Sequence, residues 1–275
     1  MTAVLLALVS AILFGAMTVA IRAGLRGGEA RAAALATVLP ALAIALAAAI
    51  VDGGDWLDAW PFLLAGLLAP GASQILFTRS IREAGASRTS VAVGGAPLVA
   101  VAVALVFLGE PVRAPLVLGA LLVVGGGILL VREPDRPAHV RAFALLFAAG
   151  ATLLFAVRDN VIRALHAHAD PPTAAAAALL AGTVVALVAA RRLPERGEAR
   201  RLLPAGVLFG LSYLCLFEAY FRGRVSVVSP LVATESLWGV ALSVLVFRGA
   251  EGVGRRLVAG AVLVVAGGAL IGIYR

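Results

Sequence analysis

The stretch LVLGALLVVGGGILL, from Leu116 to Leu130, returns 141 residues later as LVAGAVLVVAGGALI, from Leu257 to Ile271, and ten of the fifteen positions are identical. The same offset aligns LFGAMTVAIRA, which starts at Leu13, with LFAVRDNVIRA, which starts at Leu154. Matches near both ends of a unit indicate duplication of the whole unit, because two apolar patches that merely resemble each other would match only locally. The chain is therefore predicted to contain two copies of one unit.

The composition predicts that both copies lie in a membrane. Hydrophobic residues make up 62% of the chain and charged residues 14%, and the mean hydropathy is +1.03. A soluble domain carries about 25% charged residues, so this chain has too little polar surface for a water-facing globule. Apolar stretches of about 20 residues recur, which is the length needed to cross about 30 Å of hydrocarbon. We expect an all-α, polytopic membrane protein.

Apolar runs separated by Arg, Asp, Gly and Pro predict ten transmembrane helices, five in each copy. They lie near residues 2–21, 32–51, 59–78, 89–108, 114–131, 142–163, 172–190, 202–221, 225–247 and 256–273. The first copy is expected to cover residues 1–131 and the second residues 141–275, with a polar linker at 132–140.

The arginines predict how the helices are oriented. All 23 basic side chains are Arg, and seventeen lie in the loops after the odd-numbered helices, against five on the opposite side. By the positive-inside rule both termini are non-cytoplasmic. Five helices per copy is an odd number, so the copies must lie upside down relative to each other. The loop at 52–58 has three acids and no Arg, while its counterpart at 191–201 has five Arg, as inversion requires.

The basic charge and the single cysteine exclude other classes of protein. The pI of about 11.2 arises from arginines in short loops between apolar stretches, which is the distribution of topology signals rather than of a nucleic-acid surface. Cys215 stands alone and can form no intramolecular disulfide. No cofactor motif is recognised, because the Gly125-Gly-Gly127 run follows no strand.

These residues resemble the drug/metabolite transporter superfamily, in its ten-helix form with two EamA domains. The first copy carries Phe107-Leu-Gly-Glu-Pro111, and Leu116-Val-Leu-Gly-Ala-Leu-Leu follows it. The second carries Val228-Ser-Pro-Leu-Val-Ala-Thr234, then Glu251, then Leu257-Val-Ala-Gly-Ala-Val. The resemblance implies small-molecule transport by alternating access, often export of metabolites, amino acids or drugs, with a central cavity between the halves. Many ten-helix relatives have cytoplasmic termini, and the arginine count here points the other way.

Four charged residues fall inside predicted helices, namely Arg158, Asp159, Glu218 and Glu235. A charge at the bilayer centre costs about 2.5–3.5 kcal/mol on insertion scales and usually faces a cavity or a partner. All four lie in the second copy, and Met17 and Thr18 stand where the Arg-Asp pair would fall in the first. We therefore expect the second copy to carry the site.

Glu235 is the leading candidate for substrate binding or coupling. It lies near the middle of the ninth predicted helix, with Trp238 about one turn beyond it. A carboxyl group there could exchange a proton as the cavity opens to either side, or bind a cationic group of a substrate, or be fixed structurally to Arg158. Glu218 lies about one turn from the end of its helix, where its carboxyl group could reach water.

The Arg-Asp pair and two amides complete the candidates. Asp159 precedes Arg163 by four residues, which favours a structural ion pair on one helix face. Arg158 and Asp159 point about 100° apart on a helix, so we expect Arg158 to need Glu218, Glu235 or an anionic substrate instead. Asn160 and Gln74 are secondary candidates, more typical of hydrogen bonds between helices.

Small residues and prolines predict how the helices pack and where they break. Gly119 and Gly126, like Gly260 and Gly267, are seven residues apart and share one helix face, which favours close helix packing. Ser229, Ser236 and Ser243 form a similar stripe of small residues. Pro70, Pro97 and Pro230 are expected to interrupt the third, fourth and ninth helices.

The sequence thus predicts a secondary transporter of a small organic solute in the cytoplasmic membrane, and not an enzyme. Its partners would be the solute and the lipid bilayer, without nucleic acid, cofactor or metal, as a monomer or homodimer. Proton coupling and exchange remain open. The alternatives are a non-transporting scaffold or receptor, which would leave the buried acids unexplained, and an intramembrane lipid-modifying enzyme. All three His lie outside the predicted helices, which disfavours the enzyme.

Overall fold

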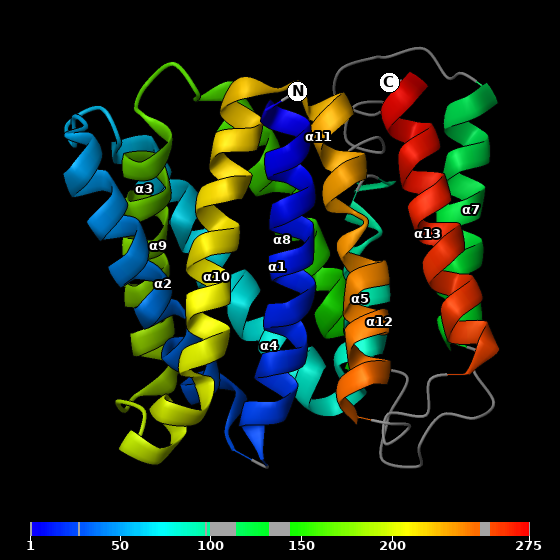
Figure 1. Ribbon diagram of the computed structural model, residues 1–275, viewed down its shortest axis with the longest axis horizontal. Helices are drawn as coiled ribbons and strands as arrows, with labels where there is room; N and C mark the ends of the chain where they lie inside the picture. The colour runs from blue at the N-terminus through cyan, green and yellow to red at the C-terminus, as the bar shows by residue number, and fades with distance from the viewer. Residues whose placement is uncertain are drawn as a thin grey trace.

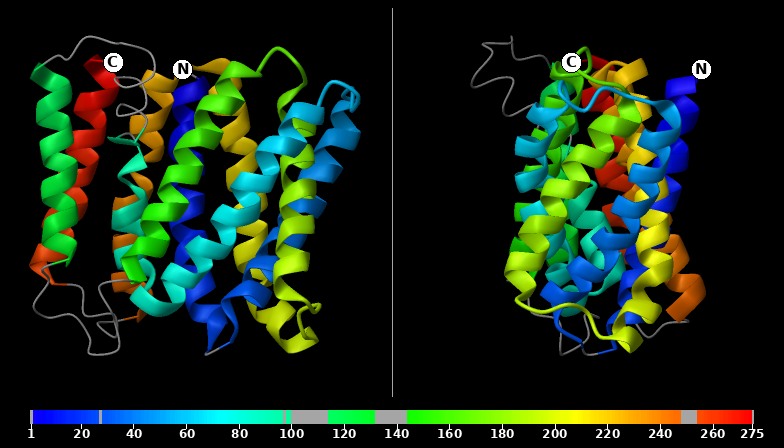
Figure 2. Two further views of the ribbon diagram at one scale, coloured as in Figure 1. Left: turned by 180° about the vertical axis from the view of Figure 1, so that it is seen from behind. Right: turned by 90° about the vertical axis from the view of Figure 1, so that its left-hand side faces the viewer.

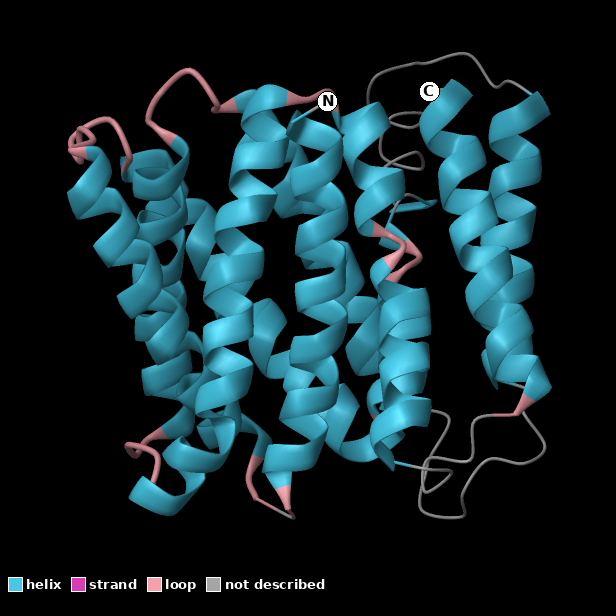
Figure 3. Cartoon of the chain, viewed as in Figure 1, coloured by secondary structure: helices cyan, strands magenta, loops and turns pink. Residues whose placement is uncertain are grey.

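A computed structural model describes residues 2–26, 28–96, 98–99, 114–131, 144–247 and 254–274. Every regular element within these ranges is a helix, and the helices stand side by side across the full height of the molecule (Figure 3). In the part of the chain that the structure describes, seven helical segments are long and apolar enough to cross a membrane. The predicted all-α, polytopic membrane fold is confirmed.

The helices follow the predicted order (Figure 1). The first copy contributes α1 (Thr2–Leu25), α2 (Ala30–Asp52), α3 (Trp60–Gly66), η1 (Leu67–Ala72), α4 (Ser73–Ala84), α5 (Ala86–Val93) and α7 (Ala114–Val131). The second contributes α8 (Leu145–Ala164), α9 (Pro171–Ala190), α10 (Arg196–Arg222), α11 (Val225–Val232), α12 (Glu235–Phe247) and α13 (Arg255–Tyr274). Half of the predicted fourth helix, the motif at 107–111, Pro97 and Glu251 lie outside the described residues.

Equivalent helices of the two copies run in opposite directions, which confirms the predicted inversion. The last helices of the copies, α7 and α13, pack against each other with Gly119 beside Gly267 and Gly126 beside Gly260. Residue numbers rise along one helix as they fall along the other, so the pair is antiparallel. The helices α5 and α12 likewise meet with Gly94 beside Ser236 and Gly239 beside Ser90.

Glycine permits the close approach of α7 and α13. A Cβ built on Gly126 would lie 2.7 Å from the carbonyl oxygen of Gly260, and one on Gly267 would lie 2.6 Å from that of Gly119. The offset between the copies makes Gly119 equivalent to Gly260 and Gly126 equivalent to Gly267. The pseudo-two-fold axis that relates the two copies therefore carries each of these two contacts onto the other. The predicted role of these glycines in close packing is confirmed.

Three spans are broken, and two of the breaks lie close to prolines that were predicted to interrupt helices. Ala69, which precedes Pro70, has non-helical φ/ψ angles of −141° and 114° between α3 and α4. The ninth span is interrupted after α11, three residues beyond Pro230, and Figure 3 shows this break near mid-height. In the fourth span α5 ends at Val93 and a turn at Gly94 follows.

The two faces of the molecule differ in charge. Both termini lie on one face in all three views, and the acidic loop that follows α2 lies on that same face (Figures 1 and 2). The opposite face, called here the arginine-rich face, holds the end of α1, the end of α4, and the loops that flank α10 and α13 at their starts. Its described arginines are Arg22, Arg26, Arg31, Arg79, Arg82, Arg191, Arg192, Arg196, Arg200, Arg201, Arg255 and Arg256.

Replacing Gly126 with Ala should destabilise the protein. The added methyl group would meet the Gly260 carbonyl oxygen and the Val264 side chain at 2.7 and 2.8 Å, and overpacking of this kind costs about 1–3 kcal/mol. The measurement is the midpoint of thermal unfolding in detergent. Gly125→Ala is the matched control, because its Cβ would meet only Leu263, at 4.0 Å. Equal midpoints for the two variants would contradict the packing role.

Candidate functional site

A small cavity lies where the two copies meet. It is lined by Ser10 and Phe14 of α1, by Phe155, Arg158 and Asp159 of α8, by Glu235 of α12, and by apolar side chains of α5, α10 and α11. The space open to the centre of a water molecule is about 20 Å³, which is room for one or two waters. The cavity is therefore closed to an organic solute in this conformation.

The broken ninth span brings Glu235 to this cavity. The break after α11 makes Glu235 the first residue of α12, so its carboxyl group stands at the N-terminus of a half-helix. A helix N-terminus carries partial positive charge, which favours an acidic side chain there. The pair on α8 reaches the same cavity from the middle of a continuous helix. Glu235, Arg158 and Asp159 are thus the three predicted site residues that the fold brings together.

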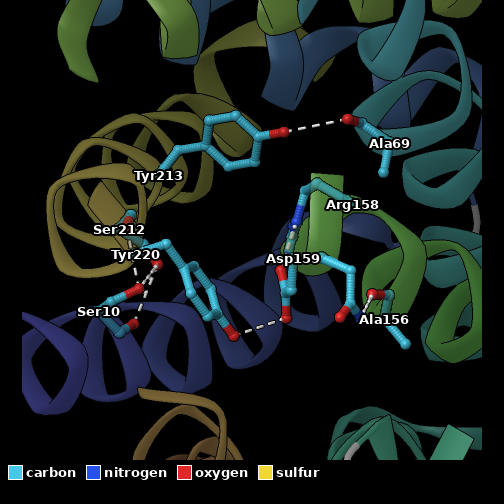
Figure 4. A network of polar contacts seen from close by, with 9 residues as sticks. Ser10, Ala69, Ala156, Arg158, Asp159, Ser212, Tyr213 and Tyr220 are labelled. Carbon is cyan, nitrogen blue, oxygen red and sulfur yellow. Dashed lines mark hydrogen bonds and ion pairs between the residues drawn. The ribbon is translucent and has the colours of Figure 1, made fainter. Parts of the chain in front are cut away.

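Arg158 and Asp159 bind each other directly, which corrects the sequence prediction. The Nε and Nη2 atoms of Arg158 donate to Asp159 Oδ1 at 2.9 and 2.8 Å (Figure 4). The argument from the 100° separation failed because the arginine side chain is long enough to fold back along the helix to its neighbour. Tyr220 of α10 donates from its hydroxyl group to Asp159 Oδ2 at 2.9 Å. Both carboxylate oxygens of Asp159 therefore have donors.

Aromatic rings complete the surroundings of the Arg158 guanidinium group. Its Cζ atom lies 4.8 Å from the ring centroid of Phe155 and 5.5 Å from that of Tyr213, distances at which a cation is attracted to the ring face. Phe155 also packs edge-on against Phe14 and Phe77, with centroids 5.8 and 5.9 Å apart. One wall of the cavity is therefore aromatic.

The expected ion pair between Asp159 and Arg163 is not formed. Arg163 instead donates from Nη1 to the carbonyl oxygens of Tyr220 and Phe221, at 3.3 and 3.2 Å. These carbonyl groups lie in the last turn of α10, where backbone acceptors lack helical partners and carry partial negative charge. The two contacts of α8 with α10, through Asp159 and Arg163, fix the two helices together.

Glu235 differs from Asp159 in having no partner. It is 7% exposed, and among the residues that the structure describes it makes no hydrogen bond or ion pair. Burying an unpaired charge is costly, and among the described residues of the lining Glu235 is the charged side chain that makes no ion pair. The hypothesis that Glu235 is fixed structurally to Arg158 finds no contact to support it.

The fold does not bring Glu218 and Trp238 into the cavity. Glu218 accepts a hydrogen bond of 2.5 Å from Arg222, four residues later, and their side chains are 25% and 55% exposed. Such an exposed pair contributes about 0–1 kcal/mol. Trp238 is 40% exposed, and its backbone packs against Gly15 of α1.

The two amide candidates also lie outside the lining of the cavity. Gln74 of α4 is fully buried and donates from Nε2 to the hydroxyl oxygen of Thr37 on α2, at 3.1 Å. Asn160 donates from Nδ2 to the carbonyl oxygen of Ala156, at 2.8 Å, one turn earlier on α8. Gln74 thus makes a hydrogen bond between helices, which is the role that the sequence analysis described as typical of such amides.

Several residues of the polar network were missed from the sequence. Ser10 and Ser212 exchange hydrogen bonds, each hydroxyl donating to the other's carbonyl oxygen at 2.9 Å (Figure 4). Tyr213 donates to the carbonyl oxygen of Ala69 at 3.1 Å, which satisfies a group that the break at Pro70 leaves free. The available signal was two tyrosines seven residues apart on one face of an apolar helix, since a buried tyrosine hydroxyl group needs a partner.

Arg88 is a buried charge that directly precedes the predicted fourth helix at 89–108. It lies in the first turn of α5, near the arginine-rich face, and is 1% exposed. The helix α5 begins directly after the turn at Gly85, and its first turn places this arginine inside the bundle.

Comparisons with known proteins agree with the fold. A family model described as the EamA-like transporter family matches the chain twice, at residues 1–132 and 142–273. A solved structure, described only as the crystal structure of a protein, is 18% identical with a TM-score of 0.70, and the match covers 98% of this chain and 95% of that one. No curated protein matches. Because the family model covers nearly the whole chain in two copies, the protein belongs to the EamA-like transporter family.

Proposed function

We propose that the protein moves a small organic solute across the cytoplasmic membrane by alternating access, with the solute or a coupling proton bound at Glu235. The observation that carries the proposal is the buried carboxyl group of Glu235, which faces the cavity without a partner. A buried acid in a membrane protein is costly and is retained where it has a function.

The position of the cavity supports this mechanism. Its walls come from α1 and α5 of the first copy and from α8, α10, α11 and α12 of the second. Transporters built from inverted repeats hold their substrates near the midplane, between the copies and at broken helices. A space of about 20 Å³ admits water but no organic solute, so the two copies must move apart before a solute can enter.

The charges of the lining favour a cationic group. Arg158 and Asp159 form an ion pair at 2.8 Å, so their charges cancel. The carboxyl group of Glu235 is the charged group of the described lining that remains. The lining therefore carries a net negative charge when Glu235 is ionised. A proton or a positively charged group of the solute would neutralise it, and the rings of Phe14 and Phe155 offer an apolar surface beside it. A proton and a cationic solute would compete for the same carboxylate.

Glu235→Gln should abolish the response to a cationic ligand. We expect a thermal-shift screen against amino acids, nucleosides and cationic drugs to yield a cation that stabilises the wild-type protein. The variant should bind that ligand about tenfold more weakly or worse, because a charge-assisted contact of about 1.5–3 kcal/mol is lost. Glu218→Gln is the matched control and should bind like the wild type. Equal affinities for Glu235→Gln and the wild type over a range of pH would overturn the proposed role of Glu235.

Arg158 and Asp159 should show strong coupling in a double-mutant cycle. Arg158→Met and Asp159→Leu alone each leave a buried charge unpaired, which costs about 3–5 kcal/mol. The double variant removes both charges and should be clearly more stable than the sum of the single effects implies. Thermal unfolding of the four proteins in detergent measures the coupling. Additive effects would mean that the contact between the two side chains contributes nothing.

Both termini should be accessible from the non-cytoplasmic side. The arginine-rich face lies opposite the termini, and arginine-rich loops remain in the cytoplasm. A reporter that is active on only one side of the membrane, fused in turn to each terminus, measures this. Cytoplasmic signals from both fusions would reverse the orientation and leave the fold unchanged.

A further inference from the structure

The connection between α9 and α10 carries a dense positive charge at the outer edge of the arginine-rich face, at the lower left of Figure 1. Residues 191–201 contain five arginines and two glutamates. Arg192 donates to Oε2 of Glu198 at 3.2 Å. Arg201 donates from Nε to the carbonyl oxygen of Gly24, at the end of α1, at 3.4 Å. Two of the five arginines therefore bind groups of the protein and hold the connection in place.

The other three arginines, called here the edge arginines, are Arg191, Arg196 and Arg200. All three are exposed, and within the described residues their side chains make no hydrogen bond or ion pair. Arg196 and Arg200 lie one turn apart on the same face of α10. The protein thus leaves three guanidinium groups of one short segment available to an external anion.

On α10 the edge arginines continue a stripe of apolar side chains. Leu203, Val207 and Leu211 are exposed, and they lie three, seven and eleven residues after Arg200, which is the spacing of one helix face. Exposed apolar side chains of a transmembrane helix contact lipid. The helix rises about 16 Å from Arg200 to Leu211, which is about half of the hydrocarbon thickness. Arg200 therefore lies where this lipid-facing stripe meets the headgroups.

The end of α9 repeats this arrangement. Val184, Leu187 and Val188 are exposed and precede Arg191 by one or two turns. Arg191 itself ends the helix with a φ of 56°, a left-handed conformation in which glycine is the usual residue. An arginine pays a conformational cost there that glycine would not. Ending the helix therefore does not explain this side chain.

Leu193 places the connection itself at the surface of the bilayer. It lies beside Arg192 and is 69% exposed. An exposed leucine among arginines is unfavourable in water, but it suits the boundary between headgroups and hydrocarbon. There the apolar side chain is buried among acyl chains while the arginines extend to the phosphate groups.

We propose that the edge arginines bind the phosphate groups of anionic phospholipids in the leaflet at the arginine-rich face. A guanidinium group donates two parallel hydrogen bonds to phosphate oxygens. The excess of arginine over glutamate in the segment favours an anionic headgroup over a zwitterionic one. A nucleic acid or an acidic protein in solution would reach the arginines but would leave the apolar stripes without a contact, whereas a lipid satisfies both. This site is independent of the proposed role of Glu235.

Native mass spectrometry tests the site, because it resolves the protein with each bound lipid. The full-length protein in detergent is titrated with phosphatidylglycerol, phosphatidylcholine or glycerol phosphate. We expect phosphatidylglycerol to bind at least about tenfold more tightly than phosphatidylcholine, since each arginine near an anionic headgroup contributes about fivefold. Equal affinities for the two lipids would overturn the proposal. Equally tight binding of glycerol phosphate would show a site for a soluble anion and would overturn the lipid as its ligand.

Arginine variants locate the site. The combined variant Arg191→Gln, Arg196→Gln and Arg200→Gln should bind phosphatidylglycerol at least about tenfold more weakly than the wild type. Arg200→Gln alone should lose about fivefold, and the matched control Arg82→Gln should lose nothing. Arg82 is exposed on the same face, but Thr78, one turn before it, is fully buried, so no lipid-facing stripe leads to it.

Equal losses for Arg200→Gln and Arg82→Gln would assign the effect to the charge of the whole face and would overturn the site. An unchanged affinity of the combined variant would do the same. An unchanged midpoint of thermal unfolding shows that each variant is folded.

The variant Leu193→Ser tests the apolar half of the site. It keeps every arginine and should weaken the binding of phosphatidylglycerol by about fivefold, because the leucine no longer contacts the acyl chains. An unchanged affinity would overturn the contact of this segment with the hydrocarbon.

Discussion

The contact of Arg158 with Asp159 is the constraint on which the site depends. An arginine at membrane depth must have a partner, because the surrounding hydrocarbon offers none. Asp159 supplies it at 2.8 Å, and Tyr220 of α10 occupies the second carboxylate oxygen. This network pairs the carboxylate of Asp159 and fixes α8 against α10. Among the described residues of the lining, Glu235 is left as the charged group that makes no ion pair.

The helix breaks place this chemistry at the centre of the membrane. A continuous ninth helix would bury its backbone groups in its own hydrogen bonds, and Glu235 would lie in the middle of a helix face. The break after α11 instead puts Glu235 at a helix N-terminus beside the cavity. The break at Pro70 frees the carbonyl oxygen of Ala69, and the hydroxyl group of Tyr213 binds it. Of these two breaks, one is therefore stabilised by a side chain of α10 and the other is occupied by a site residue.

The fold could be predicted from the sequence to the level of helices, inversion and helix contacts. Apolar length, loop charge and the spacing of Gly119 and Gly126 are local or periodic signals, and each reflects a constraint that the bilayer imposes on every span. The site could be predicted only in part. The charged residues were visible because charge is rare at that depth. Their partners were not visible, because a contact such as that of Tyr220 with Asp159 joins residues 61 apart and depends on how two helices are rotated.

Two errors in the sequence analysis have the same physical origin. The separation of Arg158 from Asp159 was argued from the directions of their Cβ atoms, and the helix pair of Asp159 with Arg163 from their spacing. The first rule describes the directions of Cβ atoms, and the second describes a helix with no neighbour that offers another acceptor. An arginine side chain reaches several ångströms from its Cα atom, so it binds the best acceptor within that reach. For Arg158 this is the adjacent carboxylate, and for Arg163 it is the carbonyl end of α10.

The broken symmetry of the repeat also bears on the transport cycle. A transporter made of two inverted copies has two end states, each open to one face. The two states have equal energy only if the helix contacts that separate in each state carry equivalent residues. Separating α5 from α12 exposes the hydroxyl groups of Ser90 and Ser243, which water satisfies. The offset of 141 residues places Leu231 and Ala102 at the equivalent positions, and apolar surface costs about 25 cal/mol per Å² in water. In the proposed alternating-access cycle, the serines would therefore lower the energy of the state open to the arginine-rich face relative to its counterpart.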